Sequence, residues 1–322
     1  MFKPKKIYLA PMEGTLDSAL RHAICPVGGY DMAFTEFVRV TDHLYGDDIF
    51  HRYCPELHNG GKTNDSTPMA IQLLGSDPIA MAENAHKAVE LGIGHIDVNF
   101  GCPAKTVNNS GGGAEMLKNT NAIHDVMCAI KKHLPSGIGF SGKMRLGYSD
   151  SSALVDNARA IDDAGVDFIT IHARTKSQAY RGYADWNSVG ILKSFVSCDI
   201  VINGDITSFE TMQTALKQSN ADSVMVGRGA LMCPNLGNAL KGQTPFTWQQ
   251  ALKCVFDYTQ TQPPYLNTTL DDYHSARIKQ WFSQFLIHTY PQAEEVFNTL
   301  KRLNPTEFMK QLNKNQFYGK SE

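Results

Sequence analysis

The stretch HIDVNFGCPAKTVNNSGGGAEML at residues 95–117 carries the strongest structural signal in this chain. Its apolar run at 96–100 is flanked by glycines and a proline, which is typical of a strand buried on both faces in a parallel sheet. Pro103 keeps Cys102 out of helical geometry, so we expect the thiol just outside the carboxyl end of this strand. Glycines 111–113 permit positive φ and the close approach of a large flat or phosphorylated ligand. A lone cysteine is also commonly a small buried hydrophobe, so the neighbouring strands must decide its role.

Similar short β-rich runs recur along the first 226 residues, each followed by a polar or glycine-bearing loop. They lie at 6–12, 32–38, 69–74, 138–146, 168–172, 200–203 and 223–226. Between them are segments with helical spacing, among them 78–91, 120–133, 151–164 and 208–218. Eight alternations of strand and helix predict an α/β fold, a (β/α)₈ TIM barrel. A doubly wound sheet is the rival fold, and the absence of G-x-G-x-x-G after the first run makes it the weaker one.

The pattern changes after Pro234. The segments 247–258, 272–288, 292–303 and 306–315 all have helical spacing, and prolines lie at their boundaries. We therefore expect two domains, a barrel over 1–240 and an all-helical C-terminal domain over 241–322.

Composition narrows the class of protein. The chain has 322 residues, of which 42% are hydrophobic and 19% are charged, as in ordinary soluble globular proteins. No apolar run reaches the length of about 18 residues needed to cross a membrane, so a cytoplasmic protein without membrane association is expected. The seven cysteines form no C-x-x-C pair and no zinc-ligand spacing, which predicts reduced thiols. Nothing indicates an obligate protein partner.

The net charge of -2 argues against a general nucleic-acid binder. The charge is distributed unevenly, however, because residues 241–322 hold nine Lys and Arg against seven Asp and Glu. This mild basic excess permits contact with nucleic acid in the C-terminal region but does not require it.

Active sites of such barrels lie at the carboxyl ends of the strands, and here every strand ends in polar residues. Besides Asn99 and Cys102, these residues are Glu13, Glu36, Arg39, Gln72, Lys143, Arg145, His172, Arg174, Asn203, Asp205 and Arg228. Each has a structural alternative: Lys143 could extend from a strand end to solvent, His172 could be a hydrogen-bonded core histidine and Gln72 could cap a loop. Polar groups at every strand end are nevertheless too many to be explained by packing.

The turns after the seventh and eighth strands carry the clearest ligand signal. Asn203-Gly204-Asp205 and Gly227-Arg228-Gly229 expose backbone N–H groups beside an arginine, as phosphate sites of barrels do after these strands. Lys143 and His172, with carboxamides nearby, suit a flat heterocycle bearing carbonyl oxygens and ring nitrogens. Flavin mononucleotide (FMN) has both parts, whereas no cluster of carboxylates and histidines is arranged for a metal.

Taken together, these residues resemble the bacterial tRNA-dihydrouridine synthases. The motifs that carry the resemblance are APMEG at 10–14, TEF at 35–37, QLLG at 72–75, DVNFGCPAKTV at 97–107, GGGA at 111–114, KMRLG at 143–147, HART at 172–175, INGDI at 202–206 and GRGA at 227–230. The chain is further similar to the C subfamily, which modifies uridine 16, in TEFVRV at 35–40, SQAYRG at 177–182 and YHSARIKQW at 273–281. The motifs span the barrel in the family's order.

The resemblance implies a role for individual residues. FMN would be held by Pro11, Met12, Glu13, Gln72, Lys143, His172, Asn203, Gly204, Asp205, Gly227 and Arg228. Cys102 would be the catalytic proton donor and Asn99 would bind the target uracil. Contacts to tRNA would come from Arg39, Arg145, Tyr180, Arg277, Lys279 and Lys301, with Arg302 as an alternative to Lys301.

The activity implied is reduction of the 5,6 double bond of a uridine in the D-loop of tRNA. NADPH would reduce FMN, the flavin hydride would go to C6 of uracil, and Cys102 would protonate C5. The alternatives are an FMN barrel acting on a free pyrimidine-like molecule, an aldolase with Lys143 as Schiff-base lysine, and an RNA-binding factor with incidental catalysis. The basic helical region has no purpose in the first, Cys102 has none in the second, and Cys102, Lys143 and His172 together argue against the third.

Overall fold

The computed structural model describes residues 2–108 and 111–314, and its core is a closed parallel barrel. The ring runs β1-β2-β4-β5-β6-β7-β8-β9 and closes because β1 pairs with both β2 and β9. The strands are β1 (Ile7–Leu9), β2 (Met32–Phe34), β3 (Val38–Arg39), β4 (Met69–Leu74), β5 (His95–Phe100), β6 (Gly139–Arg145), β7 (Phe168–His172), β8 (Asp199–Asn203) and β9 (Ser223–Val226). The predicted TIM barrel is confirmed.

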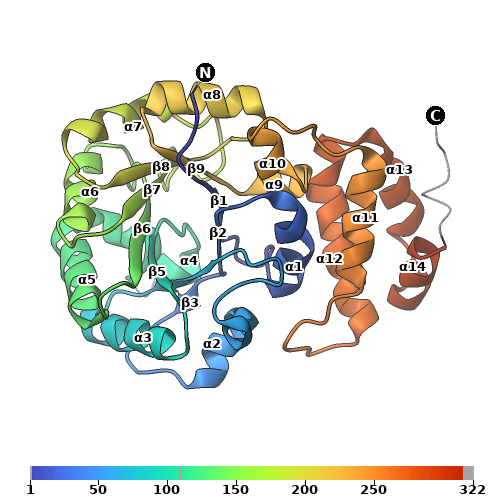
Figure 1. Cartoon of the computed structure of the whole chain (residues 1–322), viewed down its shortest axis with the longest axis horizontal. Coiled ribbons are helices and arrows are strands. Elements are labelled where there is room, and N and C mark those ends of the chain that lie inside the picture. Colours follow the sequence, from blue (N-terminus) through green and yellow to red (C-terminus); the bar gives the residue numbers. More distant parts are fainter. Residues whose placement is uncertain (1, 109–110, 315–322) are drawn as a thin grey trace.

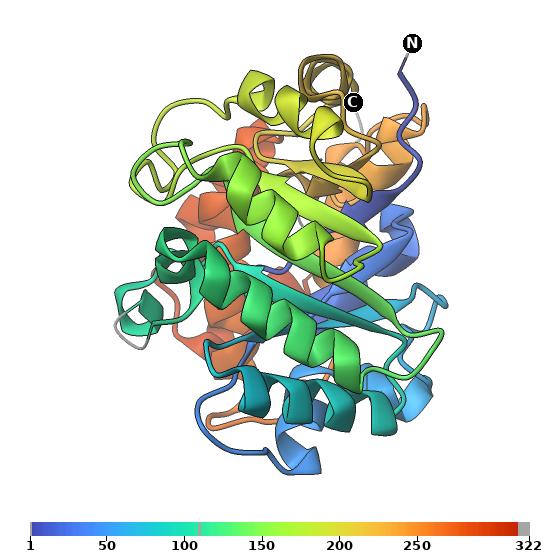
Figure 2. The same cartoon turned by 90° about the vertical axis from the view of Figure 1, so that its left-hand side faces the viewer.

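Helices surround the barrel between successive strands (Figures 1 and 2). The α-helices of this part are α1 (Ser18–Gly28), α2 (Asp47–Tyr53), α3 (Pro78–Glu90), α4 (Lys105–Asn108), α5 (Thr120–His133), α6 (Leu154–Asp162), α7 (Trp186–Val189), α8 (Phe209–Ser219), α9 (Arg228–Met232) and α10 (Leu236–Leu240). The 3₁₀ turns are η1 (Pro55–Asn59), η2 (Gly113–Lys118) and η3 (Gly190–Ser194). In Figure 2 the helices α3, α5 and α6 pack side by side over the strands behind them.

Strand β5 shows how the alternation of side chains builds two cores. Ile96, Val98 and Phe100 point outward and belong to the large apolar cluster beneath the helices. His95 points inward, where its ring stacks on Phe168 at a centroid distance of 5.3 Å. Phe168 stacks in turn on Tyr8 at 5.0 Å, so aromatic side chains fill the barrel interior below the polar residues of the mouth.

The C-terminal region is helical, as the sequence predicts. It comprises α11 (Trp248–Thr259), α12 (Leu270–Gln284), η4 (Leu286–His288), α13 (Pro291–Leu300) and α14 (Pro305–Leu312). Figure 1 shows it against the side of the barrel that carries α1, α9 and α10. Helix α11 packs on α1, and the Trp281 indole donates to the carbonyl oxygen of Leu231 at 2.8 Å. The apolar core is therefore continuous from the barrel into this region.

The second barrel strand differs from its predicted range of 32–38. It is divided into β2 and β3 around Thr35, whose side-chain hydroxyl accepts the hydrogen bond of the Gln72 backbone N–H at 3.1 Å. The predicted helix at 272–288 is likewise divided, since α12 ends at Gln284 and η4 follows.

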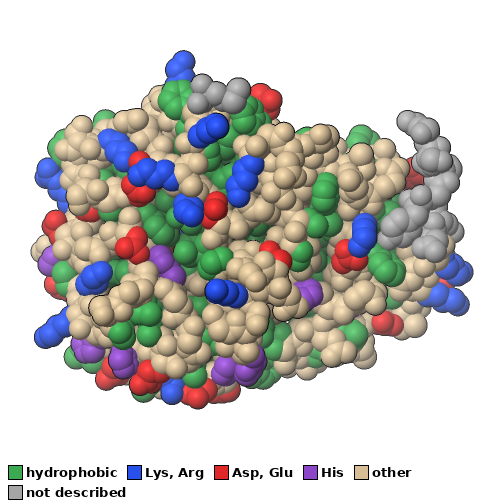
Figure 3. Space-filling model, viewed as in Figure 1, with side chains coloured by type: hydrophobic (Ala, Val, Ile, Leu, Met, Phe, Trp, Pro, Cys, Tyr) green, Lys and Arg blue, Asp and Glu red, His purple; other side chains and the backbone are tan. Residues whose placement is uncertain are grey.

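The surface in Figure 3 carries Lys and Arg side chains interspersed with Asp and Glu. That distribution agrees with the small net charge of the chain. Across residues 2–108 and 111–314, the structure contains no helix long and apolar enough to span a membrane.

Candidate active site

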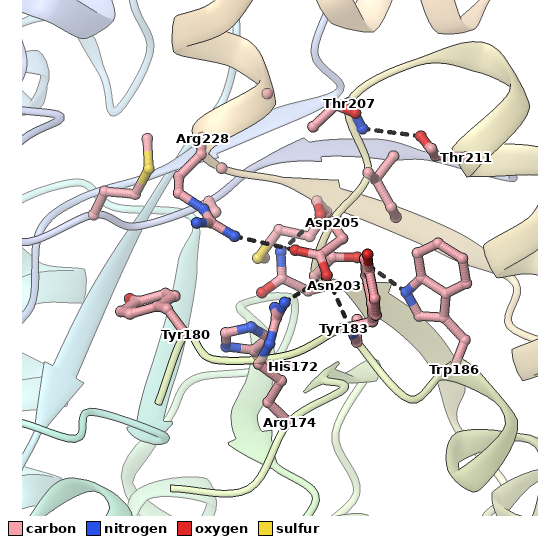
Figure 4. Close-up of a pocket in the computed structure, with 18 of the residues that line it drawn as sticks. His172, Arg174, Tyr180, Tyr183, Trp186, Asn203, Asp205, Thr207, Thr211 and Arg228 are labelled. Atoms are coloured by element: carbon pink, nitrogen blue, oxygen red, sulfur yellow. Dashed lines mark hydrogen bonds and ion pairs between the residues drawn. The ribbon is translucent and has the colours of Figure 1, made fainter. Parts of the chain in front are cut away.

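A cavity of about 710 Å³ opens at the carboxyl ends of the strands (Figure 4). This volume lies within the range of small-molecule and cofactor sites. Its lining includes Pro11, Met12, Lys143, His172, Arg174, Tyr180, Tyr183, Trp186, Asn203, Gly204, Asp205, Thr207, Gly227 and Arg228. The residues lie on or just after β1, β6, β7, β8 and β9 and in the loop after β7, so the closure of the barrel brings them together.

Charged neighbours form several hydrogen bonds with the turn after β8. Asp205 accepts hydrogen bonds from Arg174 at 2.5 Å and from Arg228 at 3.1 Å, and it also accepts from the Ala184 N–H at 2.9 Å. Gly204 has φ +116°, and a Cβ there would lie 3.1 Å from Cδ2 of His172. Glycine is therefore required at this turn, and the carboxylate keeps two arginines at the cavity wall (Figure 4).

Arg174 has more donors than the described residues satisfy. Its guanidinium is buried, and the Nε and Nη1 atoms lack a hydrogen-bond partner, while Nη2 binds Asp205 and the Gly182 carbonyl oxygen. Unpaired buried donors are costly, so their presence in a cavity wall indicates an anionic or carbonyl-bearing ligand. With Arg228 and the glycine turns, this wall fits the phosphorylated end of FMN.

Lys143 and His172 form the inner part of the cavity. Burial, and then the neighbouring Arg145, lower the pKa of Lys143 to about 8, and its Nζ donates to Asn203 Oδ1 at 3.3 Å. Burial and the positive charge of Lys143 lower the pKa of His172 well below its ordinary value, so its imidazole is neutral. The site thus combines the Lys143 ammonium group, which loses its proton readily, with the neutral imidazole of His172, whose N–H can donate a hydrogen bond. This combination suits the polar edge of a flavin.

A chain of buried hydrogen bonds connects the barrel interior to Cys102. His95 Nε2 and Ser141 Oγ lie 2.9 Å apart, and Ser141 donates to Asp97 at 2.5 Å. Asp97 also accepts from Gln72 Nε2 at 2.6 Å, and Gln72 Oε1 accepts from Asn99 Nδ2 at 2.7 Å. Asn99 Oδ1 then accepts from the N–H of Cys102 at 2.9 Å. Because a carboxylate only accepts, Asp97 fixes the orientation of both carboxamides.

Cys102 lies at the end of this chain in a mostly apolar setting. Its side chain packs with Phe37, Leu74 and Val107, and the pairing of β5 with β6 places Asn99 beside Lys143. Burial, and to a smaller degree the carboxylate of Glu13, raise the pKa of the Cys102 thiol. The sulfur is therefore protonated at neutral pH, as a proton donor requires and a nucleophile does not.

We expect Asp97→Leu to slow the proton transfer predicted for Cys102 about tenfold, because both carboxamides lose their fixed orientation. Asp97→Asn is the matched control: its oxygen still accepts from Gln72 and its amide can donate to Ser141, so its rate should stay near that of the unaltered protein. Single-turnover reoxidation of the reduced protein measures the step, and thermal melting checks folding. Equal rates in folded Leu and Asn variants would contradict an orienting role.

Most of the predicted cofactor residues line the cavity, and two do not. The nine that do are Pro11, Met12, Lys143, His172, Asn203, Gly204, Asp205, Gly227 and Arg228. Gln72 lies buried in the chain beneath Asn99. The Glu13 side chain reaches solvent, although surrounding atoms and then Glu36 raise its pKa to about 7. A direct cofactor contact from either residue stays a prediction.

The residues predicted to contact tRNA fall into two groups. Arg145 and Tyr180 lie at the mouth, where the guanidinium is 5.6 Å from the tyrosine ring centroid, and Arg39 bonds the Thr106 carbonyl oxygen nearby. The other three are on the helical region: Arg277 binds the Gly14 carbonyl oxygen and faces the barrel, Lys279 donates to Leu303, and Lys301 donates to Asn298. Arg277 and Lys279 therefore lie on different faces of α12, which their spacing of two residues explains.

Three cavity residues have no role in the sequence-based assignment. Arg174 stands in the HART motif but receives no function there, whereas the structure places it between Asp205 and the cavity. Trp186 donates to the Gly204 carbonyl oxygen at 2.9 Å, and Tyr183 is 92% exposed at the cavity edge. The motif spacing signals Arg174, but the sequence carries no comparable signal for the two aromatic residues.

Comparison with known proteins identifies the family. Residues 8–318 match the model of the family described as Dihydrouridine synthase (Dus). The "tRNA-dihydrouridine(16) synthase" of Shewanella oneidensis is 41% identical over 303 residues, covering 94% of this chain and 95% of that protein. The protein of the same name from Escherichia coli O157:H7 is 41% identical over 301 residues, covering 93% and 94%.

Solved structures with the same fold are more distant in sequence. The old yellow enzyme homologue from Zymomonas mobilis aligns with a TM-score of 0.56 at 14% identity, covering 81% of this chain and 96% of that one. A morphinone reductase variant aligns with a TM-score of 0.53 at 12% identity, covering 74% and 87%. These likenesses support the barrel fold.

Proposed function

We propose that this chain, which belongs to the dihydrouridine synthase family, reduces the 5,6 double bond of uridine 16 in the D-loop of tRNA. FMN is the cofactor and NADPH the reductant. The observation that carries the proposal is the Cys102 thiol, whose pKa is raised by burial, at the end of β5. Asn99 of the same strand pairs with Lys143 of β6, and Lys143 lines the cavity that also contains Arg174 and Arg228.

Separate groups of residues are placed to hold the phosphate and the ring of the cofactor. The phosphate would be held by Arg228, Arg174 and the glycine turns after β8 and β9, and the ring would be contacted by Lys143 and His172. A Cβ at Gly227 would lie 3.3 Å from the sulfur of Met12, so glycine avoids a tight contact with that side chain. Bound FMN supplies the hydride that the reduction of uracil needs.

Cys102 completes the addition across the double bond. Hydride addition at C6, the chemistry that the bound cofactor would supply, places negative charge on C5, and Cys102 would transfer its Sγ proton there. The thiolate that remains regains a proton from solvent, and NADPH is oxidised to NADP⁺. Asn99, fixed by Gln72 and by the Cys102 N–H, presents its remaining amide hydrogen to a uracil carbonyl.

The target base has to leave the folded tRNA to reach the barrel mouth, which costs a few kcal/mol that backbone contacts offset. We assign those contacts to Arg39, Arg145 and Tyr180 at the mouth and to Arg277, Lys279 and Lys301 on the helical region. On this proposal residues 1–240 form the catalytic domain and residues 241–322 the tRNA-binding domain.

The test is anaerobic reduction of the purified protein with NADPH, followed by addition of tRNA that lacks dihydrouridine. We expect the flavin absorbance to return with this tRNA, and not with free uridine or with a transcript carrying cytidine at position 16. Reoxidation by free uridine would favour a small-molecule oxidoreductase. Reoxidation by the cytidine-16 transcript would keep the activity and overturn the position.

A further inference from the structure

Outside the cavity, three loops at the carboxyl ends of neighbouring strands bring two lysines onto one tyrosine ring. Lys118 ends η2 after β5, Tyr148 follows β6, and Lys176 follows β7. The Nζ of Lys118 is 3.8 Å from the ring centroid and that of Lys176 is 4.4 Å from it. Lys176 also donates to the Tyr148 hydroxyl at 2.9 Å, and Lys118 donates to Glu115 at 2.6 Å.

This cluster has more positive than negative charge. Two ammonium groups contact one tyrosine ring, and a single carboxylate, Glu115, lies beside them. The hydrogen bond from Lys118, followed by the positive charges of Lys118 and Lys176, lowers the pKa of Glu115. The hydrogen bond to Glu115 raises the pKa of Lys118, so that side chain stays charged. Like charges held close together repel each other, and a bound anion would remove that repulsion.

The backbone keeps the cluster in place. The Lys176 N–H donates to the Gly147 carbonyl oxygen at 2.9 Å, and the Ser177 N–H donates to the Tyr148 carbonyl oxygen at 2.9 Å. The lysine stems are thus anchored by loops that are bonded to each other, while about half of the Lys118 side chain stays exposed to solvent. Such pre-organised donors bind an anion with a smaller loss of conformational entropy.

The position of the cluster indicates which anion it meets. In the ring of strands β6 lies opposite β1, and the helical region packs on α1, which follows β1. The cluster therefore stands across the mouth from the helical region. It is continuous with the mouth itself, because Arg145 donates to the carbonyl oxygen of Thr175, the residue before Lys176, at 3.2 Å.

We infer that Lys118, Tyr148 and Lys176 form a binding site for a backbone phosphate of the tRNA, on the side of the mouth away from the helical region. This inference rests on the proposed function. Contacts on both sides of the mouth hold the RNA while the target uridine is drawn out between them, and a phosphodiester supplies the negative charge that the cluster lacks.

The test compares Lys118→Ala, Lys176→Ala and the double variant with Lys132→Ala, which lies in the last turn of α5 at the amino ends of the strands. Dissociation constants for tRNA are measured between roughly 50 and 200 mM salt. We expect each cluster variant to bind about threefold to tenfold more weakly at low salt, with a shallower salt dependence by about one counterion per lysine. Lys132→Ala should match the unaltered protein, and Lys176→Arg should restore most of the affinity.

Flavin reduction by NADPH and turnover at saturating tRNA should stay within about twofold in every variant, because the cluster does not touch the cavity. A salt dependence identical to that of Lys132→Ala would overturn the phosphate site while leaving the proposed function intact. Failure of the unaltered protein to be reoxidised by any tRNA would instead overturn the proposed function.

Discussion

Replacing Cys102 by alanine is expected to lower tRNA-driven reoxidation by about 10²–10⁴, the usual loss when a general acid is removed. The expectation follows from the position of the thiol at the end of β5 and from the burial that raises its pKa and keeps it protonated. Binding of FMN and its reduction by NADPH should be unaltered, because the cavity lining does not include Cys102. Stopped-flow absorbance separates the two half-reactions.

Two further variants serve as controls: Cys102→Ser tests whether the acidity of the thiol matters, and Cys128→Ala tests the effect of removing a cysteine elsewhere. A hydroxyl is a much weaker acid than a thiol, so the serine variant should be slowed nearly as much as the alanine variant. Cys128 lies half-buried on α5 outside the barrel, and its replacement should leave both half-reactions unchanged. Turnover by Cys102→Ala at the rate of Cys128→Ala would remove Cys102 from the mechanism.

The barrel itself can be predicted from sequence because each strand is a short apolar run with a polar end. Strands β4, β7 and β9 have the predicted bounds, and β5 and β8 begin one residue earlier. The division of the second strand escapes prediction, since it depends on a hydrogen bond between Thr35 and the backbone of β4. A pairwise tertiary contact of this kind leaves no periodic trace in the sequence.

The cavity shows the same contrast. Gly204 and Arg228 can be assigned because glycine-rich turns after late barrel strands have a known use. The link from His95 through Ser141 and Asp97 to Gln72 cannot be assigned, because those residues lie on β4, β5 and β6 and meet only when these three strands pair side by side. In the sequence Asp97 is one polar residue within an apolar run, whereas in the fold it sets the orientation of two carboxamides.

In the helical region, the contacts of the basic residues on α12 also differ from what the sequence suggests. Arg277 and Lys279 are two residues apart in the sequence and suggest one basic surface, but helix geometry directs them to different neighbours. Tyr273 donates to Asp17 at 2.6 Å, and Asp17 also caps α1. Arg277 and Tyr273 therefore fasten the helical region to the loop that leaves β1, so a loss of tRNA affinity in an Arg277 variant has to be separated from a shift of that loop.

Replacing Lys143 by methionine is expected to slow flavin reduction by NADPH by about 10²–10³, the loss typical of removing one preorganised donor to developing charge. Lys143 is buried at the inner end of the cavity, beside the neutral His172, and its ammonium group is therefore the cation positioned to balance negative charge gained by the ring. Methionine keeps the length and volume of the side chain, so folding and the cavity should be preserved. Rapid-mixing absorbance at the flavin band gives the rate, and bound flavin per chain is the control.

The pKa of Lys143 adds a pH test with a defined sign. Burial lowers that pKa to about 8, so the charged form is lost as the pH rises through that value, and the reduction rate should fall above it. The free energy of unfolding of the apoprotein should instead increase over this range. A lysine whose pKa is lowered by folding adds stability as the pH rises from about 8 towards its ordinary pKa. Lys143→Met should abolish both dependences and Lys143→Arg should keep a charge above pH 8. A Met variant that retains the pH profile of the unaltered protein would show that the titrating group is another residue.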